Sequence, residues 1–268
     1  MTAFDAYERR TWAGRAAAFA GSAAGLCAYP VPRLLDAAGV GARSRVLDVG
    51  TGTGTVAAAA CGRGAAVTAV DAEPSMVELA ARTVPSAEVL TAVLPELPFG
   101  DGVFDAAVGN FVLNHVGRPD EALAELRRVV RPGGRIALTV WVHPAPAGQA
   151  LLGRAVAAAG VARPSHLPAP PGEDELPHRP DGLARLLASA GLCEARCETL
   201  RWQHRTGAEE WWSGPANGVG FLGQVLLSQD ERTRAEVRRH FDTLSREFLR
   251  EDGLLALPHA ALLVSARR

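Results

Sequence analysis

Short runs in which almost every residue is apolar recur through the first half of the chain. They occupy residues 45–49, 65–70, 87–93, 103–109 and 135–142. Continuous apolarity over such short runs is typical of strands buried on both faces, as in a parallel sheet. The segments between them carry apolar residues at helical spacing, and Asp120 is expected to cap one such helix. Alternating strands and helices predict an α/β fold with a doubly wound sheet.

The second half of the chain is organised differently. Residues 192–204 and 254–265 are expected to add two further strands, and residues 181–190 are expected to form an amphipathic helix before the first of them. The block 206–250 holds a tryptophan pair and a charged helix expected at residues 230–250, which predicts a helical insertion between these two strands. A further alanine-rich helix is expected at residues 150–160.

These patterns divide the chain into four parts. Residues 1–42, with helices expected at 11–20 and 32–38, form a lid or a layer packed on the sheet. The remaining parts are a core at 43–205 that contains a proline-rich loop at 143–181, a helical cap at 206–250, and a last strand at 251–268.

Three glycines alternate directly after the first predicted strand, at Gly50, Gly52 and Gly54. Glycine adopts positive φ and leaves no Cβ between the backbone and a ligand, and ligands of doubly wound sheets bind at the carboxyl ends of strands. Asp48 is charged within a buried strand, so we expect loop N–H groups and a ligand ammonium as its partners. The dinucleotide pattern G-x-G-x-x-G fails because its third glycine would fall at Thr55, which counts against an NAD(P)-binding oxidoreductase without removing that alternative.

A second acidic residue, Asp71, ends the second predicted strand. An acid at this place accepts hydrogen bonds from the ribose hydroxyls of a nucleoside cofactor. The competing interpretation is a helix N-cap, but Pro74 and Ser75 already supply helix-start chemistry. We therefore assign Asp71 to a ribose, which NAD and S-adenosylmethionine both carry.

Taken together, five motifs resemble those of the class I S-adenosylmethionine-dependent methyltransferases. They are D-x-G-x-G-x-G from Asp48, the acid–serine–methionine segment at 71–80, the L-P-F…F-D stretch at 94–105, the strand exit at 110–116, and the helix–P-G-G–strand unit at 120–142. The resemblance runs over residues 45–142. It implies a Rossmann-like, seven-stranded, mostly parallel sheet with an antiparallel last strand and a helical cap, and S-adenosyl-L-methionine as cofactor.

The resemblance also implies a set of cofactor-binding residues, in which Arg15 of the lid would reach a carboxylate. The set is Arg15, Asp48, Gly50, Thr51, Gly52, Asp71, Ala72, Met76, Val93, Leu94, Asn110 and Phe111. Val93 departs from the family pattern, which usually has an acidic residue there to accept from the adenine amino group. Adenine contact would then rest on backbone groups near Val93 and Leu94.

Methyl transfer from a sulfonium is an in-line displacement that requires positioning and exclusion of water. Histidine is the usual base near neutral pH, and His115 and His143 follow the fourth and fifth strands at the ligand-binding edge. Either histidine could instead be structural. Substrate contacts are expected from Trp12, Trp141, His166, His178, Trp211, Trp212 and Phe221, although the cap aromatics could simply pin the cap to the core.

Composition narrows the function further. The net charge of −1 gives no basic footprint for nucleic acid, and the absence of lysine excludes Schiff-base chemistry. The four cysteines lack the spacing of a metal site, and neither a signal peptide nor a membrane span is visible, which predicts a cytoplasmic protein.

We therefore expect methyl transfer to an O, N or C atom of a small, partly apolar molecule, in bacterial secondary metabolism such as antibiotic biosynthesis. A cyclase of the same fold that binds the cofactor without transferring methyl is the alternative. The oligomeric state is left open.

Overall fold

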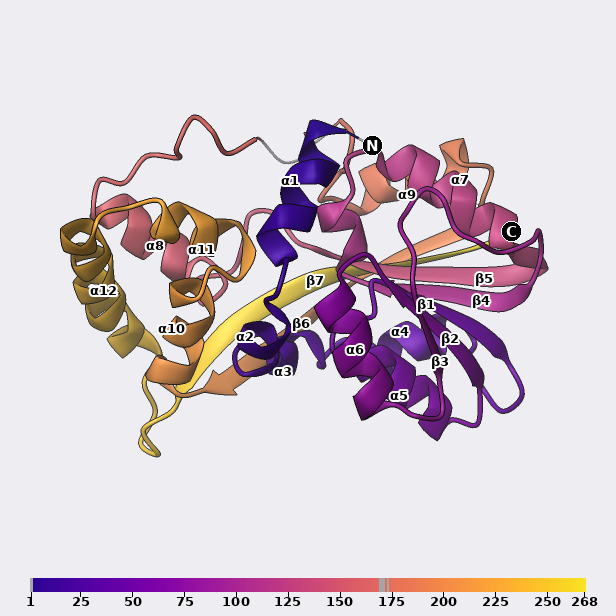
Figure 1. Cartoon of the computed structure of the whole chain (residues 1–268), viewed down its shortest axis with the longest axis horizontal. Helices are drawn as coiled ribbons and strands as arrows, with labels where there is room; N and C mark the ends of the chain where they lie inside the picture. The colour runs from indigo at the N-terminus through magenta and orange to yellow at the C-terminus, as the bar shows by residue number, and fades with distance from the viewer. Residues whose placement is uncertain (1, 169–171, 173) are drawn as a thin grey trace.

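One seven-stranded sheet forms the centre of the computed structural model, which describes residues 2–168, 172 and 174–268 (Figure 1). The strands lie in the order β3-β2-β1-β4-β5-β7-β6. Their bounds are β1 Arg45–Val49, β2 Ala66–Asp71, β3 Glu88–Thr91, β4 Phe104–Asn110, β5 Val130–Trp141, β6 Cys193–Thr206 and β7 Leu255–Arg267. β1 to β5 pair in parallel and β7 runs antiparallel to both of its neighbours. The predicted α/β fold and strand directions are confirmed.

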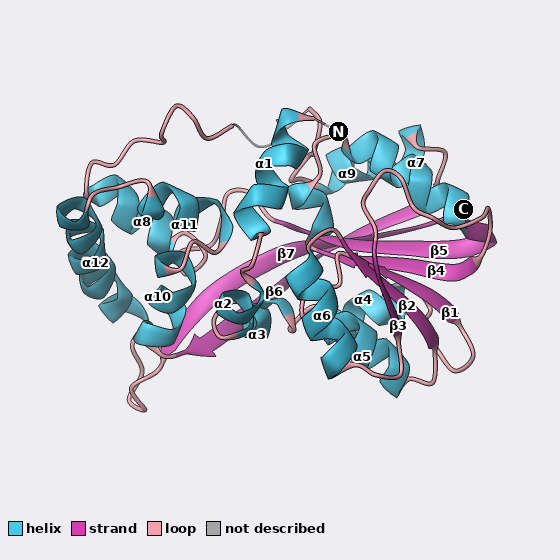
Figure 2. Cartoon of the chain, in the orientation of Figure 1, coloured by secondary structure: helices cyan, strands magenta, loops and turns pink. Residues whose placement is uncertain are grey.

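Helices cover both faces of this sheet (Figure 2). One face carries α4 (Val31–Ala37), α5 (Thr55–Gly62) and α6 (Pro74–Thr83), and the other carries α7 (Pro119–Val129) and α9 (Pro180–Ser189). Separate buried clusters lie on the two faces, built around α4 and α5 on one and around α7 and α9 on the other. Because both faces are buried, the central strands are apolar throughout rather than alternating.

The motif at 94–105 holds the connection between β3 and β4 in place. The Leu97 N–H donates to the Glu125 carboxylate at 2.8 Å, and the Arg128 guanidinium donates to the Phe99 carbonyl at 2.8 Å. The rings of Phe99 and Phe104 meet edge to face with their centroids 5.1 Å apart. This motif therefore packs the loop onto α7.

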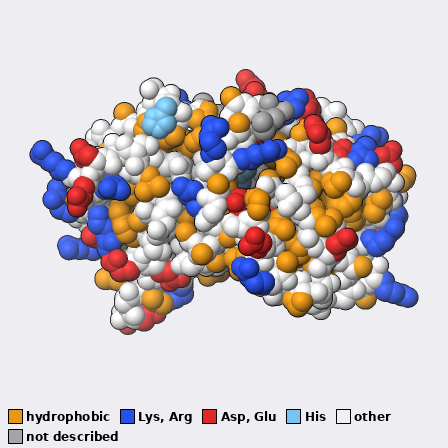
Figure 3. Space-filling view, in the orientation of Figure 1, with side chains coloured by type: hydrophobic (Ala, Val, Ile, Leu, Met, Phe, Trp, Pro, Cys, Tyr) orange, Lys and Arg blue, Asp and Glu red, His pale blue; other side chains and the backbone are white. Residues whose placement is uncertain are grey.

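A second lobe is carried by the far ends of β6 and β7. β5 pairs with β7 only as far as Trp141, opposite Ala261, whereas β6 and β7 stay paired to Thr206, opposite Leu255. On this projecting two-stranded arm sit α10 (Ala208–Ala216), α11 (Gly220–Leu227) and α12 (Glu231–Ser245), with arginines gathered over the α12 end (Figure 3).

The cap is assembled from two segments of the chain. The helix α8 (Leu151–Ala158) lies within the segment assigned to the proline-rich loop, yet it packs on α12 and shares a buried cluster with Val237 and Phe241. Residues 169–171 and 173 of that loop, which include Pro170 and Pro171, lie outside the described residues.

The helix predicted at residues 11–20 is wrong. Three helices replace it: α1 Ala3–Trp12, α2 Ala16–Ala20 and α3 Ala24–Cys27. A capping box between Thr2 and Asp5 starts the chain in a helix, and Gly14, at φ 68°, ends that helix in a turn. The resulting α1 lies between the cap and the core (Figure 1).

Two smaller expectations also fail. Arg118 is the N-cap of α7 and Pro119 opens the helix, so Asp120 lies in its first turn instead of capping it. The charged helix ends at Ser245 and is followed by a 3₁₀ turn, η2 (Arg246–Phe248). Among the helices described, none is long and apolar enough to cross a membrane.

Candidate functional site

The loop between β1 and α5 brings three glycines to the carboxyl edge of the sheet. Gly50, Gly52 and Gly54 have φ of 67°, 54° and 86°. A Cβ on Gly50 would come within 2.7 Å of Val112 Cγ2, whereas one on Gly52 would meet only Phe19 Cε1, at 3.6 Å. Packing therefore requires glycine at position 50, and at position 52 its absence of a side chain leaves the backbone open to close approach.

Asp48 lies beneath this loop and is fully buried. Its Oδ2 accepts from the Thr51 hydroxyl at 2.7 Å, and its Oδ1 has no hydrogen-bond partner among the residues described. Burial raises the pKa of Asp48 to about 7, although the Thr51 hydrogen bond opposes this. An unpartnered buried carboxylate oxygen fits a cationic ligand group such as an ammonium.

Asp71 connects the end of β2 to the glycine loop. Its Oδ2 accepts from the Gly52 N–H at 2.8 Å and its Oδ1 from the Glu73 N–H at 3.0 Å. The N-cap of α6 is Glu73, which accepts from Met76 N–H at 3.1 Å, so the capping alternative for Asp71 is not what the structure has. Each Asp71 oxygen keeps a lone pair for a further donor, which is the arrangement that ribose hydroxyls need.

The exit of β4 is fixed by Thr139 on the neighbouring strand. The Thr139 hydroxyl donates to Asn110 Oδ1 at 2.7 Å and accepts from the Phe111 N–H at 2.9 Å. Asn110 Nδ2 donates to the Cys27 carbonyl at 2.7 Å, so its amide is occupied in holding α3. The Phe111 ring stacks on Trp141 with centroids 3.8 Å apart.

His115 is paired with an acidic residue that sequence reasoning missed. In the 3₁₀ turn η1 (Val112–His115), its Nδ1 lies 2.7 Å from Oε2 of Glu8 on α1. The Trp12 indole N–H donates to the same oxygen at 3.1 Å. Glu8 lies 107 residues from His115 along the chain, so no local pattern connects them. His143, the second candidate base, is exposed.

Beyond Phe111, a row of rings runs onto the β6–β7 arm. We call Trp141, Trp202, His204, Trp211 and His259 the aromatic wall. Neighbouring centroids in it lie 5.2 to 6.3 Å apart. Trp202 and His259 are cross-strand partners, and Trp202 and His204 share one face of β6 because they are two residues apart. Three members of this wall, Trp202, His204 and His259, were missed from the sequence.

The wall holds polar ring atoms in an apolar enclosure. His204 is only 5% exposed, and neither of its ring nitrogens has a hydrogen-bond partner within the part of the chain that is described. The Trp202 indole N–H is likewise unpartnered there. Burial lowers the pKa of His204 and takes that of His259 to about 4, so both rings are neutral at pH 7.

The other predicted substrate residues are scattered. Trp212 lies beside Phe241, with ring centroids 5.2 Å apart and the rings tilted by 46°, and packs inside the cap together with Phe221. His178 Nδ1 lies 2.7 Å from the Trp141 carbonyl oxygen, and His166 is exposed on its loop.

Among the remaining predicted cofactor residues, Arg15 lies against the turn between α10 and α11. A Cβ placed on Gly218 there would come within 2.9 Å of Arg15 Nε. Met76 is buried in α6, Ala72 follows β2, and Val93 forms an isolated bridge with Glu96 beside Leu94. The binding roles of these residues stay predictions.

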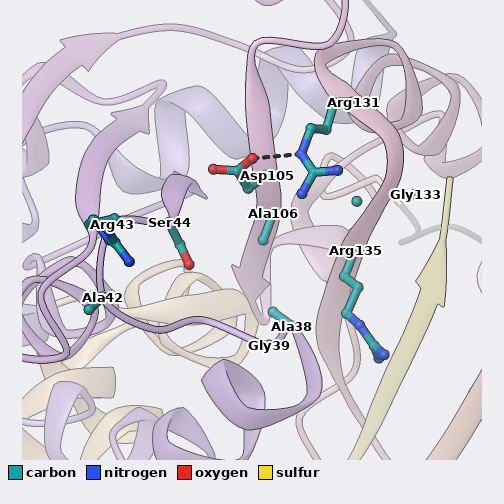
Figure 4. Close-up of a pocket in the computed structure, with 11 residues that line it drawn as sticks. Ala38, Gly39, Ala42, Arg43, Ser44, Asp105, Ala106, Arg131, Gly133 and Arg135 are labelled. Atoms are coloured by element: carbon teal, nitrogen blue, oxygen red, sulfur yellow. Dashed lines mark hydrogen bonds and ion pairs between the residues drawn. The ribbon is translucent and has the colours of Figure 1, made fainter.

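A surface hollow of about 330 Å³ lies at the opposite, amino edge of the sheet (Figure 4). In it Arg131 points to Asp105, with Nε 2.6 Å from Oδ1, while Arg135 points away from that pair. None of the predicted site residues lines this hollow. In the described ranges no three metal-ligating side chains gather at a common point.

Comparisons with known proteins find similarity in the segment that carries the glycine loop. Residues 47–138 match the model of a methyltransferase domain family. The demethylmenaquinone methyltransferase of Renibacterium salmoninarum is 37% identical over 111 residues, covering 41% of this chain and 47% of that protein. The chain thus spans about half the length of the curated relatives it matches.

Two solved structures share the fold over most of the chain. A putative methyltransferase from Bacillus halodurans gives a TM-score of 0.57 at 19% identity, covering 88% of this chain and 97% of its own. The [4+2]-cyclase SpnF gives a TM-score of 0.54 at 19% identity, covering 90% and 80%. Residues 47–138 thus match a methyltransferase domain family, and the glycine loop and the strand order agree with the fold of the class I S-adenosylmethionine-dependent methyltransferases.

Proposed function

We propose that this protein transfers the methyl group of S-adenosylmethionine to an O, N or C atom of a small, partly apolar molecule. The observation that carries the proposal is the pairing of two acids with the glycine loop. Asp71 accepts from Gly52 N–H, and Asp48 Oδ1 lies beneath the same loop without a partner. A ligand that carries ribose hydroxyls and an ammonium group satisfies both acids.

Each of these residues has a defined part in holding the cofactor. Asp71 would accept from the ribose hydroxyls, Asp48 would face the ammonium group, and Gly52 would allow the ligand to contact the backbone. The Phe111 ring, fixed on Trp141, borders the reacting end. The cofactor, when bound, supplies an electrophilic methyl group on a sulfonium.

We assign His115 as the base that removes the acceptor's proton. It follows β4 at the same edge as the glycine loop. Its ring is 38% exposed and therefore accessible to an acceptor molecule. Removing a proton raises the nucleophilicity of an O–H, N–H or acidic C–H group as the bond to the methyl carbon forms.

The acceptor is proposed to be a planar ring compound that carries a hydroxyl or carbonyl group. The aromatic wall offers ring faces for stacking, and the unpartnered nitrogens of His204 offer hydrogen bonding to an oxygen substituent. Quinone-type rings, as in the name of the relative from Renibacterium salmoninarum, and bacterial natural-product rings both belong to this class.

A cyclase that binds the cofactor without methyl transfer is the second candidate. It is favoured by the same aromatic wall, because an enclosed row of rings can hold a flexible substrate in a reactive conformation. In that case His115 would be dispensable, and no S-adenosylhomocysteine would form.

Calorimetric titration tests the cofactor assignment. S-adenosylhomocysteine is expected to bind the wild-type protein at micromolar or lower concentration, whereas NADH at the same concentration is not expected to bind. Asp71→Asn removes one carboxylate acceptor and should weaken binding by about 1.5–3 kcal/mol, the scale for hydrogen bonds to a charged group. Glu78→Gln on the exposed face of α6 serves as the matched control. Tighter binding of NADH would refute the proposal.

A further inference from the structure

The N-terminal helix α1 is tied to the edge of the core by hydrogen bonds near both of its ends. Asp5 Oδ1 accepts from the Gly117 N–H at 2.7 Å, and Glu8 Oε2 lies 2.7 Å from His115 Nδ1. At the far end of the helix, the Gly14 N–H donates to Glu73 Oε1 at 3.1 Å. The partners follow β4 and β2, so α1 lies across the two loops that border the cofactor site.

We propose that Glu8 is a positioning residue for His115, and that docking of α1 assembles the proton acceptor of the reaction. The inference rests on the function proposed above. An ionised carboxylate only accepts hydrogen bonds, so the 2.7 Å contact assigns the donor role, and hence the proton, to His115 Nδ1. The Nε2 atom is then left with a lone pair, which is the form that a general base requires.

Trp12 holds the carboxylate in place. Its indole N–H lies 3.1 Å from the Glu8 oxygen that contacts His115 and 3.4 Å from His115 Nδ1 itself. The carboxylate oxygen is the closer acceptor and the charged one, so the indole donates to Glu8 and leaves Nδ1 to donate as well. Its ring meets that of His115 edge to face at 5.3 Å and that of Phe19 at 5.6 Å. Phe19 Cε1 would lie 3.6 Å from a Cβ placed on Gly52, so this row of rings leads from His115 toward the glycine loop.

The burial of Glu8 supports a positioning role. Its side chain is 11% exposed, whereas the imidazole ring is 38% exposed. The acid is therefore shielded from water and the histidine is not. A buried acid facing a histidine that keeps an accessible edge has the geometry of the carboxylate–imidazole pairs that fix a tautomer.

The proton and electron balance is complete within this arrangement. An electron pair of the acceptor atom forms the bond to the methyl carbon, and the carbon–sulfur bond breaks with its pair going to sulfur. His115 Nε2 takes the acceptor's proton, and the resulting imidazolium faces the Glu8 carboxylate. The proton then passes to water.

Nitrogen-15 NMR of histidine-labelled protein without cofactor tests the inference. We expect His115, identified by its loss in His115→Gln, to carry its proton on Nδ1 in the wild type. Glu8→Ala should abolish this tautomer preference, and the exposed Arg9→Ala on the same helix should keep it. A proton on Nε2 in the wild type, or an unchanged spectrum in Glu8→Ala, would overturn the assignment.

Single-turnover kinetics give the second readout. Glu8→Ala should slow methyl transfer by about tenfold or more, a part of the 10²–10⁴ that general bases contribute, with S-adenosylhomocysteine affinity unchanged within twofold. Trp12→Phe keeps an aromatic ring and removes the indole N–H donor. Its rate of methyl transfer should lie between those of Glu8→Ala and the wild type. If Glu8→Ala lowers the affinity for S-adenosylhomocysteine or the melting temperature but leaves the rate of methyl transfer unchanged, Glu8 has only a structural role. If the wild type transfers no methyl group, the proposed function fails, while the NMR result still decides the tautomer.

Discussion

The carboxyl group of Asp48 couples the cofactor site to protonation. It is fully buried, and its pKa is about 7 in the fold against 3.8 in the unfolded chain. Because the folded pKa is raised, the stability from this group is complete below about pH 3.8 and is lost as the pH rises through about 7. A ligand ammonium beside Oδ1 would favour the ionised form, so cofactor binding near pH 7 should release a proton.

Asp48→Asn should therefore flatten the pH dependence of stability. Between pH 4 and 7 the free energy of unfolding of the wild type should decline relative to that of the variant, as measured by urea denaturation. Asp105 and Glu125 do not interfere, because their pKa values are lowered by arginines and their contribution is already present above pH 5. Parallel curves for the two proteins would contradict the burial argument.

At the scale of elements, the loop between β1 and α5 contains glycines that packing requires and one glycine, Gly52, that we propose for cofactor binding. A Cβ on Gly54 would meet Val84 Cγ2 at 2.9 Å, whereas one on Gly52 meets only Phe19 at 3.6 Å. Both have positive φ, so a substitution at either costs about 1 kcal/mol in backbone strain. The difference between them lies in what each faces.

We expect Gly52→Val to weaken the affinity for S-adenosylhomocysteine by about 100-fold or more while the protein stays folded. Gly54→Val should instead lower the melting temperature more than Gly52→Val does. The atoms added at position 54 clash with α6 and with Val84, the residue that follows α6. Gly62→Ala, which has open space around it, is the control for both. Calorimetry and thermal unfolding of the three variants separate the effects; unchanged affinity in Gly52→Val would remove the loop from the site.

The β6–β7 arm is the other element on which the account depends. It extends the sheet past β5, so Trp202 and His259 come to lie beside Trp141, and His204 lies next to His259. The alternation of Trp202 and His204 on β6 is visible in the sequence, but the length of the arm and its partner strand are not. Trp202, His204 and His259 were missed because their assembly depends on strand pairing across the whole cap insertion.

At the scale of the whole molecule, local sequence patterns predicted the sheet but not the contacts between segments that lie far apart in the chain. The apolar runs and the glycine turn located β1 to β5, Asp48 and Asp71, because buried strands and turns leave short-range signals. The three N-terminal helices, the recruitment of α8 into the cap, and the Glu8–His115 pair depend on packing between distant segments. No periodicity encodes such contacts.

The measurement that tests the account most directly is the fate of a labelled methyl group. The wild-type protein would be incubated with S-adenosylmethionine labelled on the methyl carbon and a panel of quinol-type and phenolic ring compounds. If the protein transfers methyl groups, label should appear in a product, with one S-adenosylhomocysteine formed for each label transferred. His115→Gln should lose this reaction and keep its affinity for the cofactor. An unlabelled, rearranged product without S-adenosylhomocysteine would contradict methyl transfer and favour the cyclase.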